Sequence, residues 1–393
     1  MAKWHCADLS NSVEHPPAFP AAGNPIAYGL PDCSQSGEFD TSGCPIRVPR
    51  VVYRGTDSNI YELALVDEKW QWNNLLSVSA KWGQPPAASS DPTAFVGTFN
   101  DQAVAMLVYT ALSTDVYQLM GPDGWIASDL STTTPPAAPA QGRPFGYSTG
   151  DGDCRAVYLG PDGSIFELLS QQQGPWVCNN LSTNYKAGPK APAAGGNPFA
   201  YVTNVPRVIY RGTDGHIFEL SPRTYWEWAD LTDISGGAPA AVTFPYPATG
   251  DPNAYVTNDG IARVVYAAAD GDVIELRLEG GGWKWASLLT ANRTTQDVQL
   301  AAGNPFGYVA PDSVPRVVYT GHDGNIYELT PEPPLPPASW QHRAPSWQLN
   351  NLSKLSGGAP AAVGDPFGYW IFDNIPRVVY RGTNNKIYEL SLW

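Results

Sequence analysis

Two short apolar runs separated by a turn recur along the chain. In one copy, Arg207 to Tyr210 is followed by Asp214-Gly215 and then by Ile217 to Leu220. Asp-Gly between β-branched and aromatic runs favours a hairpin, because these residues accept the backbone angles of a tight turn. The sequence therefore predicts seven β-hairpins, whose first strands contain Tyr53, Tyr109, Tyr158, Tyr210, Tyr266, Tyr319 and Tyr380.

Two further segments complete each repeat. An aromatic segment precedes the hairpin, as in Phe199 to Val202, and a Trp-x4-Leu segment follows it, as in Trp226 to Leu231. Four antiparallel strands in a repeat of this length are typical of a propeller blade. We therefore predict an all-β fold, a seven-bladed β-propeller. The Trp-x4-Leu segments begin at Trp4, Trp70, Trp125, Trp176, Trp226, Trp283 and Trp347.

The two ends of the chain predict how the ring closes. The segment from Trp4 to Leu9 has no hairpin before it, and the last hairpin, which ends at Glu389-Leu390, has no complete Trp-x4-Leu segment after it. The N-terminal strand is therefore expected to complete the last blade, which would remove an exposed sheet edge. Because a propeller is one domain by architecture, residues 1–393 are expected to form a single domain.

Composition agrees with many short strands and loops. Gly and Pro each occur 38 times, 43% of the residues are apolar, and no segment keeps a helical period. The net charge of −14 comes without any cluster of Lys or Arg, which argues against nucleic acid or an anionic membrane as a partner.

No apolar run is long enough for membrane insertion. Met1-Ala2-Lys3 leads directly into the Trp4 segment, so no signal peptide is expected. The compartment is undetermined, and a soluble protein that is secreted or acts at the cell surface is the hypothesis.

The five cysteines leave the redox compartment open. Cys33 and Cys44 lie in a long insertion, where a disulfide is one of two possibilities. Cys154 and Cys178 belong to the second and fourth strands of one blade. Two strand spacings of about 4.8 Å exceed the reach of a disulfide, so these two bond only if both lie in end loops. Cys6 is left unpaired.

Motifs for catalysis are not evident in the sequence. The five histidines do not have the spacing of metal ligands, and no nucleophile, phosphate or dinucleotide motif occurs. The Asp-Gly pairs are explained by hairpin turns without a calcium ion. We therefore predict a protein that is not an enzyme and uses no cofactor or metal.

An Arg followed by a Glu twelve residues later is the most distinctive polar feature of the repeat. In one repeat Met106 and Gln118 replace the two residues and Phe95 replaces a Tyr, while the apolar positions are kept. The joint loss indicates that Arg and Glu act as a unit. The six pairs are Arg50/Glu62, Arg155/Glu167, Arg207/Glu219, Arg263/Glu275, Arg316/Glu328 and Arg377/Glu389.

Two interpretations of the unit stay open. It is either an ion pair that braces neighbouring strands, or part of a sugar site. In a sugar site, the guanidinium and carboxylate bind vicinal hydroxyls and a Trp face packs on the sugar ring. The seven Trp residues also have a structural interpretation, as core packing between blades. The hairpin loop decides whether Arg and Glu share a face: a loop of two residues separates them, and a loop of three brings them together.

The repeat resembles the fucose-binding β-propeller lectins of fungi and bacteria, through Arg-Val-x-Tyr, the Gly-containing turn, Ile and the Glu. The resemblance implies sites between blades, in which Arg and Glu of one blade and a Trp of a neighbouring blade hold the sugar. That family usually has six blades, whereas seven are predicted here, and its second aromatic residue after the Glu is not evident. The expected function is a multivalent carbohydrate-binding lectin, with up to six sites for fucose or a related sugar on glycans or glycoconjugates. The alternative is a non-catalytic structural or protein-interaction propeller in which the Arg/Glu pairs are braces.

Overall fold

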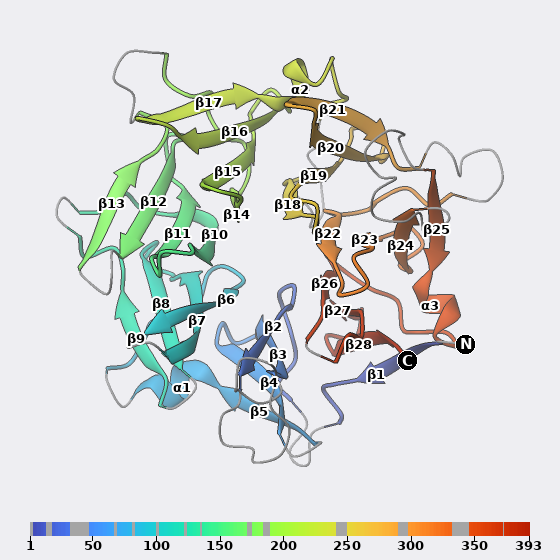
Figure 1. Ribbon diagram of the computed structural model, residues 1–393. Helices are drawn as coiled ribbons and strands as arrows, with labels where there is room; N and C mark the ends of the chain where they lie inside the picture. Colours follow the sequence, from blue (N-terminus) through green and yellow to red (C-terminus); the bar gives the residue numbers. More distant parts are fainter. Residues whose placement is uncertain are drawn as a thin grey trace.

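The computed structural model is a ring of seven four-stranded antiparallel sheets, as predicted (Figure 1). It describes residues 3–393 except 13–17, 32–46, 67–68, 81–82, 100–101, 122–123, 134–135, 171–174, 184–188, 241–249, 290–297, 332–345 and 372. Each sheet is one blade, and its strands follow one another from the axis to the rim.

We number the blades along the chain. Blade 1 is β2 (Ile26–Pro31), β3 (Arg47–Arg54), β4 (Ile60–Val66) and β5 (Lys69–Asn74); blade 2 is β6 (Thr93–Phe99), β7 (Gln102–Thr110), β8 (Val116–Gly121) and β9 (Ile126–Asp129). Blade 3 is β10 (Gln141–Ser148), β11 (Cys154–Leu159), β12 (Ile165–Ser170) and β13 (Trp176–Asn180); blade 4 is β14 (Phe199–Val202), β15 (Pro206–Arg211), β16 (Ile217–Pro222) and β17 (Trp226–Asp230). Blade 5 is β18 (Asn253–Val256), β19 (Ala262–Ala267), β20 (Val273–Glu279) and β21 (Gly282–Ser287); blade 6 is β22 (Phe306–Val309), β23 (Pro315–Thr320), β24 (Ile326–Pro331) and β25 (Trp347–Asn351). Blade 7 is β26 (Phe367–Tyr369), β27 (Arg377–Arg381), β28 (Ile387–Leu392) and β1 (Trp4–Asp8).

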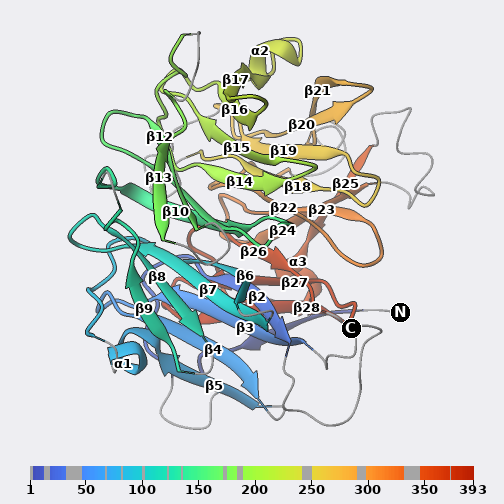
Figure 2. The ribbon, with the colours of Figure 1, turned by 60° about the vertical axis from the view of Figure 1, so that its left-hand side comes forward.

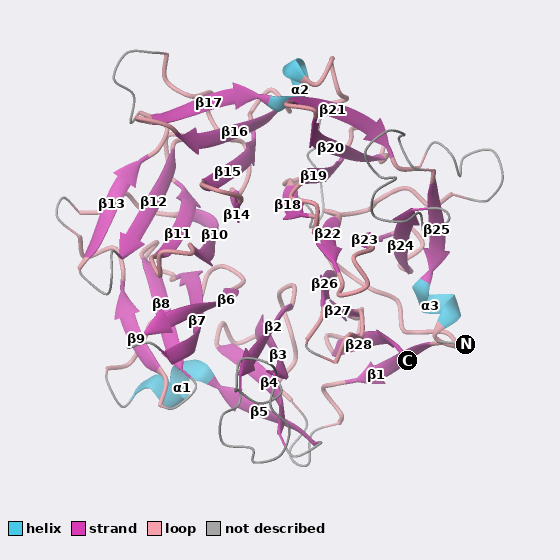
Figure 3. Cartoon of the chain, in the orientation of Figure 1, coloured by secondary structure: helices cyan, strands magenta, loops and turns pink. Residues whose placement is uncertain are grey.

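Three short helices lie at the rim (Figure 3). They are α1 (Leu75–Ser79), α2 (Leu231–Ile234) and α3 (Leu352–Leu355). Each begins at the Leu of a Trp-x4-Leu segment, and the residue before that Leu caps the first turn, as Asn74 does by accepting a hydrogen bond from the Ser77 amide. All seven of these Leu residues are buried, so the Leu anchors the end of the fourth strand in the core.

The N-terminal strand closes the ring, which confirms the prediction. Strand β1 pairs with β28 in register from Trp4 opposite Leu392 to Asp8 opposite Tyr388. The two ends of the chain lie side by side in two views (Figures 1 and 2). The edge of β28 is thereby covered by a strand from the other end of the sequence.

The hairpin loop contains three residues. In blade 4 the Gly212 amide donates to the His216 carbonyl at 2.8 Å, which leaves residues 213–215 as the loop, with Gly215 at a φ of 85°. This is a turn followed by a left-handed residue, which Gly adopts without strain. Ile209 therefore stands opposite Glu219. Arg207 lies two residues from Ile209, so Arg207 and Glu219 share a face.

The core lies between the blades. The Tyr of each hairpin's first strand is fully buried, or 1% exposed for Tyr380. Six of these phenols donate to a backbone carbonyl in the connector that leads into the blade, as Tyr210 does to Pro192 at 3.0 Å. The connectors rich in Pro and Ala therefore cover a buried hydroxyl and satisfy it.

Candidate functional site between the blades

Three side chains on one face of each regular blade form a polar cluster, as blade 1 shows. Tyr28 of β2 stands opposite Arg50 of β3, and Glu62 of β4 lies on the same face. Arg50 Nη1 donates to Glu62 Oε2 at 2.9 Å, and the Tyr28 hydroxyl donates to Glu62 Oε1 at 2.5 Å. The Glu thus binds a charged and a neutral donor at once.

All six Arg/Glu pairs form an ion pair. The shortest N···O separations are 2.9 Å for Arg50/Glu62, 3.0 Å for Arg155/Glu167, 2.5 Å for Arg207/Glu219, 2.9 Å for Arg263/Glu275, 3.4 Å for Arg316/Glu328 and 3.7 Å for Arg377/Glu389. Each Glu also accepts from a Tyr on the first strand of its blade: Tyr28, Tyr147, Tyr201, Tyr255, Tyr308 and Tyr369. The Arg and Glu therefore act as the unit that their joint loss indicated.

Burial differs strongly among the pairs. The Arg207 side chain is 22% exposed and Glu219 is 5% exposed, whereas Arg263 is 2% exposed and Glu275 is fully covered. The residue two positions after the Glu explains part of this difference. It is Ser221 in blade 4 and Arg277 in blade 5, whose long side chain lies 4.0 Å from Glu275. The pair in blade 5 is buried, and the pair in blade 4 reaches the surface.

Electrostatics keep the Tyr a donor. Burial, followed by the negative charge of Glu62, raises the pKa of Tyr28 well above its usual value, and Tyr201 beside Glu219 responds in the same way. The phenols therefore stay protonated at neutral pH. Burial also raises the pKa of Glu219, against the lowering effect of Arg207 and of the hydrogen bond from Tyr201.

The exceptional repeat replaces all three members of the cluster and has neither charge. Phe95 stands opposite Met106 and Gln118 is on the same face, with Gln118 Nε2 3.4 Å from Met106 Sδ. Met106 and Gln118 are both buried. The fold of blade 2 therefore does not require the ion pair.

Each Trp packs against the blade that precedes its own. Trp226 of blade 4 joins the apolar cluster of Tyr147 in blade 3, and Trp70 of blade 1 joins that of Tyr369 in blade 7. Trp4, Trp125, Trp226, Trp283 and Trp347 are buried, whereas Trp70 and Trp176 are partly buried. The Trp residues therefore contribute to packing between blades, and their contact with sugar stays a prediction.

Two cavities bring a Trp of the next blade to an Arg/Glu pair. One of about 280 Å³ is lined by Arg50 and Glu62 of blade 1 and by Trp125, which precedes β9 of blade 2. The other, of about 310 Å³, is lined by Arg316 and Glu328 of blade 6 and by Trp4 of blade 7. Both are close to the lower end of the range for small-molecule sites, roughly 300–1,000 Å³.

Glu167 in blade 3 is one of the six carboxylates for which a sugar contact is predicted. Its side chain is only 1% exposed, and it lines neither of the two cavities. Glu167 Oε1 accepts from Arg155 Nη1 and from the Tyr147 hydroxyl, at 3.0 Å each. Two donors of its own blade therefore bind Oε1 of Glu167. Glu167 is thus a buried acceptor that holds Arg155, and its sugar contact stays a prediction.

Burial is common to the six predicted carboxylates. All six are buried, with exposed fractions of the whole residue, backbone included, of 1% for Glu62, 1% for Glu167, 4% for Glu219, 1% for Glu275, 2% for Glu328 and 7% for Glu389. Glu62 and Glu328 nevertheless reach a cavity wall. The sequence could not distinguish these cases, because the Arg-to-Glu spacing is the same in all six repeats.

Amide side chains on the fourth strands complete the two cavities. Asn73 stands opposite Glu62 and lines the first cavity together with Gln71, and Asn350 stands opposite Glu328 and lines the second. An amide offers both a donor and an acceptor. Sequence reasoning missed these amides and the role of the Tyr, although Phe95 in place of Tyr was a signal for the latter.

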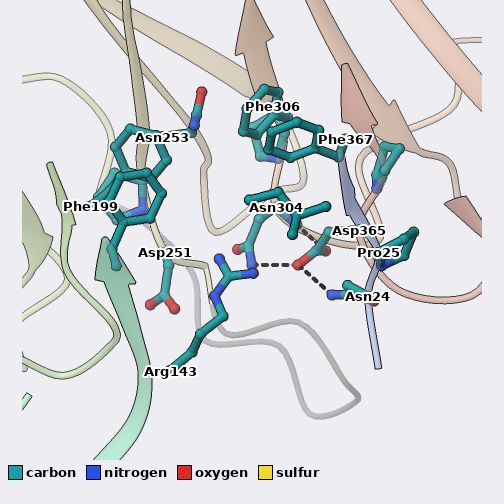
Figure 4. Close-up of a pocket in the computed structure, with 15 residues that line it drawn as sticks. Asn24, Pro25, Arg143, Phe199, Asp251, Asn253, Asn304, Phe306, Asp365 and Phe367 are labelled. Atoms are coloured by element: carbon teal, nitrogen blue, oxygen red, sulfur yellow. Dashed lines mark hydrogen bonds between the residues drawn. The ribbon is translucent and has the colours of Figure 1, made fainter. Parts of the chain in front are cut away.

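A separate small pocket lies at the axis, where each blade begins with an x-Pro step (Figure 4). Asn304 donates to Asp365 from its backbone and its side chain, at 2.8 Å each, and Asn24 Nδ2 donates to Asp365 at 3.2 Å. The Asn24 amide also donates to Asp91 at 2.9 Å. These bonds join blades 6, 7, 1 and 2. Burial raises the pKa of Asp365 to about 6.

The cysteines fit the prediction as far as the structure describes them. Cys6, Cys154 and Cys178 are free thiols. Cys154 and Cys178 lie on β11 and β13, with β12 between them, which is why they do not bond. The predicted alternative of a Cys33–Cys44 disulfide falls outside the described residues.

The comparisons with known proteins find similarity in structure. No family model matches the chain, and no curated protein matches it. A variant of Aleuria aurantia lectin in complex with Fucα1-6GlcNAc has a TM-score of 0.50 at 12% identity, covering 85% of this chain and 96% of the other. Aleuria aurantia lectin with a six-bladed β-propeller and a fucose recognition mode has the same TM-score and coverage at 13% identity. At these identities the comparisons establish the propeller fold.

In the described part of the chain, no helix is long and apolar enough to cross a membrane.

Proposed function

We propose that this protein is a multivalent carbohydrate-binding lectin whose sites lie between adjacent blades. The observation that carries the proposal is the pair of cavities in which Arg and Glu of one blade face a Trp of the next. The guanidinium supplies donors and the carboxylate acceptors for sugar hydroxyls, while the Trp offers an apolar face to the ring. Fucose is the first sugar to test, because the similar solved structures are described as fucose lectins.

The six pairs are not equivalent under this proposal. The pairs Arg50/Glu62 and Arg316/Glu328 line open cavities, and Arg207 is the most exposed Arg of the six. Arg263/Glu275 is covered, so it braces blade 5 and binds no sugar. The alternative function, a propeller for protein interaction with braces in every blade, is favoured by the burial of that pair.

The pair in blade 3 combines a partly exposed Arg with a covered Glu. Arg155 is 13% exposed, whereas Glu167 is 1% exposed. A sugar in this gap would therefore meet the guanidinium of Arg155 and not the carboxylate of Glu167. We do not count Arg155/Glu167 among the complete sites.

Several weak sites on one rigid ring would bind clustered glycans by avidity, because the second binding event is intramolecular. The ring is expected to act on glycoconjugates that display many copies of the sugar. Catalysis is not part of the proposal, since a site of this kind binds the sugar through hydrogen bonds and stacking alone.

A glycan array followed by crystals soaked in methyl-α-L-fucoside tests the proposal. We expect signal on fucosylated or related glycans, and sugar density beside Trp125 and Trp4. A blank array together with empty cavities at high sugar concentration would refute the lectin and leave the interaction propeller. Sugar bound at the axis, beside Asp365, would refute the assignment to the interblade cavities.

A further inference from the structure

The cavity between blades 2 and 3 gathers sulfur atoms of the chain. The sequence has three methionines, one of which is Met1, and the other two, Met106 and Met120, line this cavity together with Cys154. The cavity measures about 180 Å³. It lies where blade 2 carries Met106 and Gln118 in place of the Arg/Glu pair.

The three side chains converge from two blades. Met106 of β7 and Met120 of β8 are direct cross-strand partners, so their side chains leave the same face of the sheet. Cys154 begins β11 on the other side of the gap. A Cβ built on Gly97 would lie 2.8 Å from Met106 Sδ and 3.0 Å from Cys154 Sγ. The two sulfur atoms are therefore close to the same point in space, and a side chain larger than that of Gly at position 97 would collide with them.

We propose that this cavity binds a soft monovalent metal ion, Cu(I) or its analogue Ag(I), through the thioethers of Met106 and Met120 and the thiolate of Cys154. Thiolate and thioether ligands select Cu(I) over the hard cations that prefer carboxylates. This inference is independent of the sugar proposal, because blade 2 lacks the Arg/Glu pair.

Charge favours a monovalent ion. Among the described residues that line the cavity, none is Asp, Glu, Lys or Arg. One thiolate and one Cu(I) form a neutral pair, whereas a divalent ion would leave a net charge in a largely uncharged site, which is costly. The Cys154 thiol and Cu(I) give the thiolate complex and one released proton, without a change of oxidation state.

Neighbouring groups act on two of the proposed ligands, Met106 and Cys154. Gln118 Nε2 lies 3.4 Å from Met106 Sδ and limits how that thioether turns. Burial raises the pKa of the Cys154 thiol, with a smaller raising effect of the Asp153 charge and against a lowering backbone hydrogen bond from Thr98.

The test is a titration of the full-length reduced chain with Cu(I) supplied by a competing colorimetric chelator under anaerobic conditions. Met106→Leu and Met120→Leu keep nearly the same volume, so they remove sulfur with little change in packing. Each is expected to weaken Cu(I) binding by about tenfold or more, and Cys154→Ser to abolish it. Cys178→Ser, on another strand of blade 3, is the matched control and should bind as wild type.

The methionine variants decide the outcome. If Cys154→Ser removes binding while Met106→Leu and Met120→Leu bind as tightly as wild type, the ion is held by an ordinary thiol and the proposal is wrong. It is equally wrong if the Cys178→Ser variant loses the ion instead. If Cys154→Ser does not fold, the two methionine variants, with melting curves as a check of folding, still give the answer.

Discussion

The pairs Arg207/Glu219 and Arg263/Glu275 share their chemistry and differ in burial, so the same substitution in each separates binding from bracing. Glu275 accepts from Arg263 Nη1 at 2.9 Å with both carboxylate oxygens, and Arg263 is 2% exposed. Glu275→Gln leaves that guanidinium buried without a counter-charge. Removing one partner of a buried pair costs about 3–5 kcal/mol of unfolding free energy.

Glu219→Gln should cost less. Arg207 is 22% exposed, so water can solvate its guanidinium once the carboxylate is gone. The amide oxygen of Gln still accepts the Tyr201 hydroxyl. We expect a loss of about 0.5–1.5 kcal/mol, which is the usual net contribution of one hydrogen bond.

Sugar binding should be affected more by Glu219→Gln than by Glu275→Gln, which is the reverse of the effect on stability. Glu219→Gln removes a charged acceptor, which is worth about 1.5–3 kcal/mol to a ligand, so one site per chain should disappear from a titration with methyl-α-L-fucoside. Glu275→Gln should leave the number of sites unchanged. Urea unfolding and calorimetric titration of both variants measure the two effects. Equal destabilisation of the variants, or a large loss of stability in Glu219→Gln with every site retained, would refute the reasoning.

Three further predictions concern the ring and its degenerate repeat. Deletion of residues 1–10 removes β1 and uncovers β28, so the chain should aggregate or lose much of its stability; an unchanged melting curve would contradict the closure. The gap lined by Met106 and Gln118 should stay free of sugar in a soaked crystal while other gaps are occupied, and the reverse pattern would overturn the site assignment. Burial raises the pKa of Asp365 to about 6, so the folded state binds an extra proton and stability should fall as pH rises from about 4 to about 6. Asp365→Asn should flatten that fall in pH-dependent unfolding curves, and an unchanged slope would exclude Asp365 as its source.

Much of the fold could be predicted from the sequence because each level of the pattern agreed with the others. The Asp-Gly turns, the alternating runs and the Trp-x4-Leu segments predicted seven units of four strands. The unmatched segments at the two ends predicted the closure of β1 on β28. Both features depend on local chemistry repeated many times, so an error in one repeat would not have changed the result.

The site was less predictable. It depends on the number of residues in the hairpin loop and on contacts between neighbouring blades, and the sequence of one repeat reveals neither. Asp-Gly is compatible with loops of two or three residues, and only the observed pairing of Gly212 with His216 places Arg207 and Glu219 on one face. The burial of each pair depends on residues outside the Arg-to-Glu spacing. The spacing treats Glu167 like Glu62, yet of these two carboxylates only Glu62 lines one of the two cavities. The Trp that faces a pair comes from the next repeat, a relation between blades that spacing within one repeat cannot give.

The division of each proposed sugar cavity between two blades links the proposed function to the closure of the ring. Trp4 is both the first residue of the closing strand and a wall of the cavity beside Arg316 and Glu328. A single blade contains an Arg/Glu pair but no facing Trp, so it presents only half a site. An opened ring would lose the cavity between blades 6 and 7 even if the remaining blades stayed folded. Sugar binding at that cavity therefore reports on closure, whereas binding beside Arg50 and Trp125 reports on the site chemistry alone.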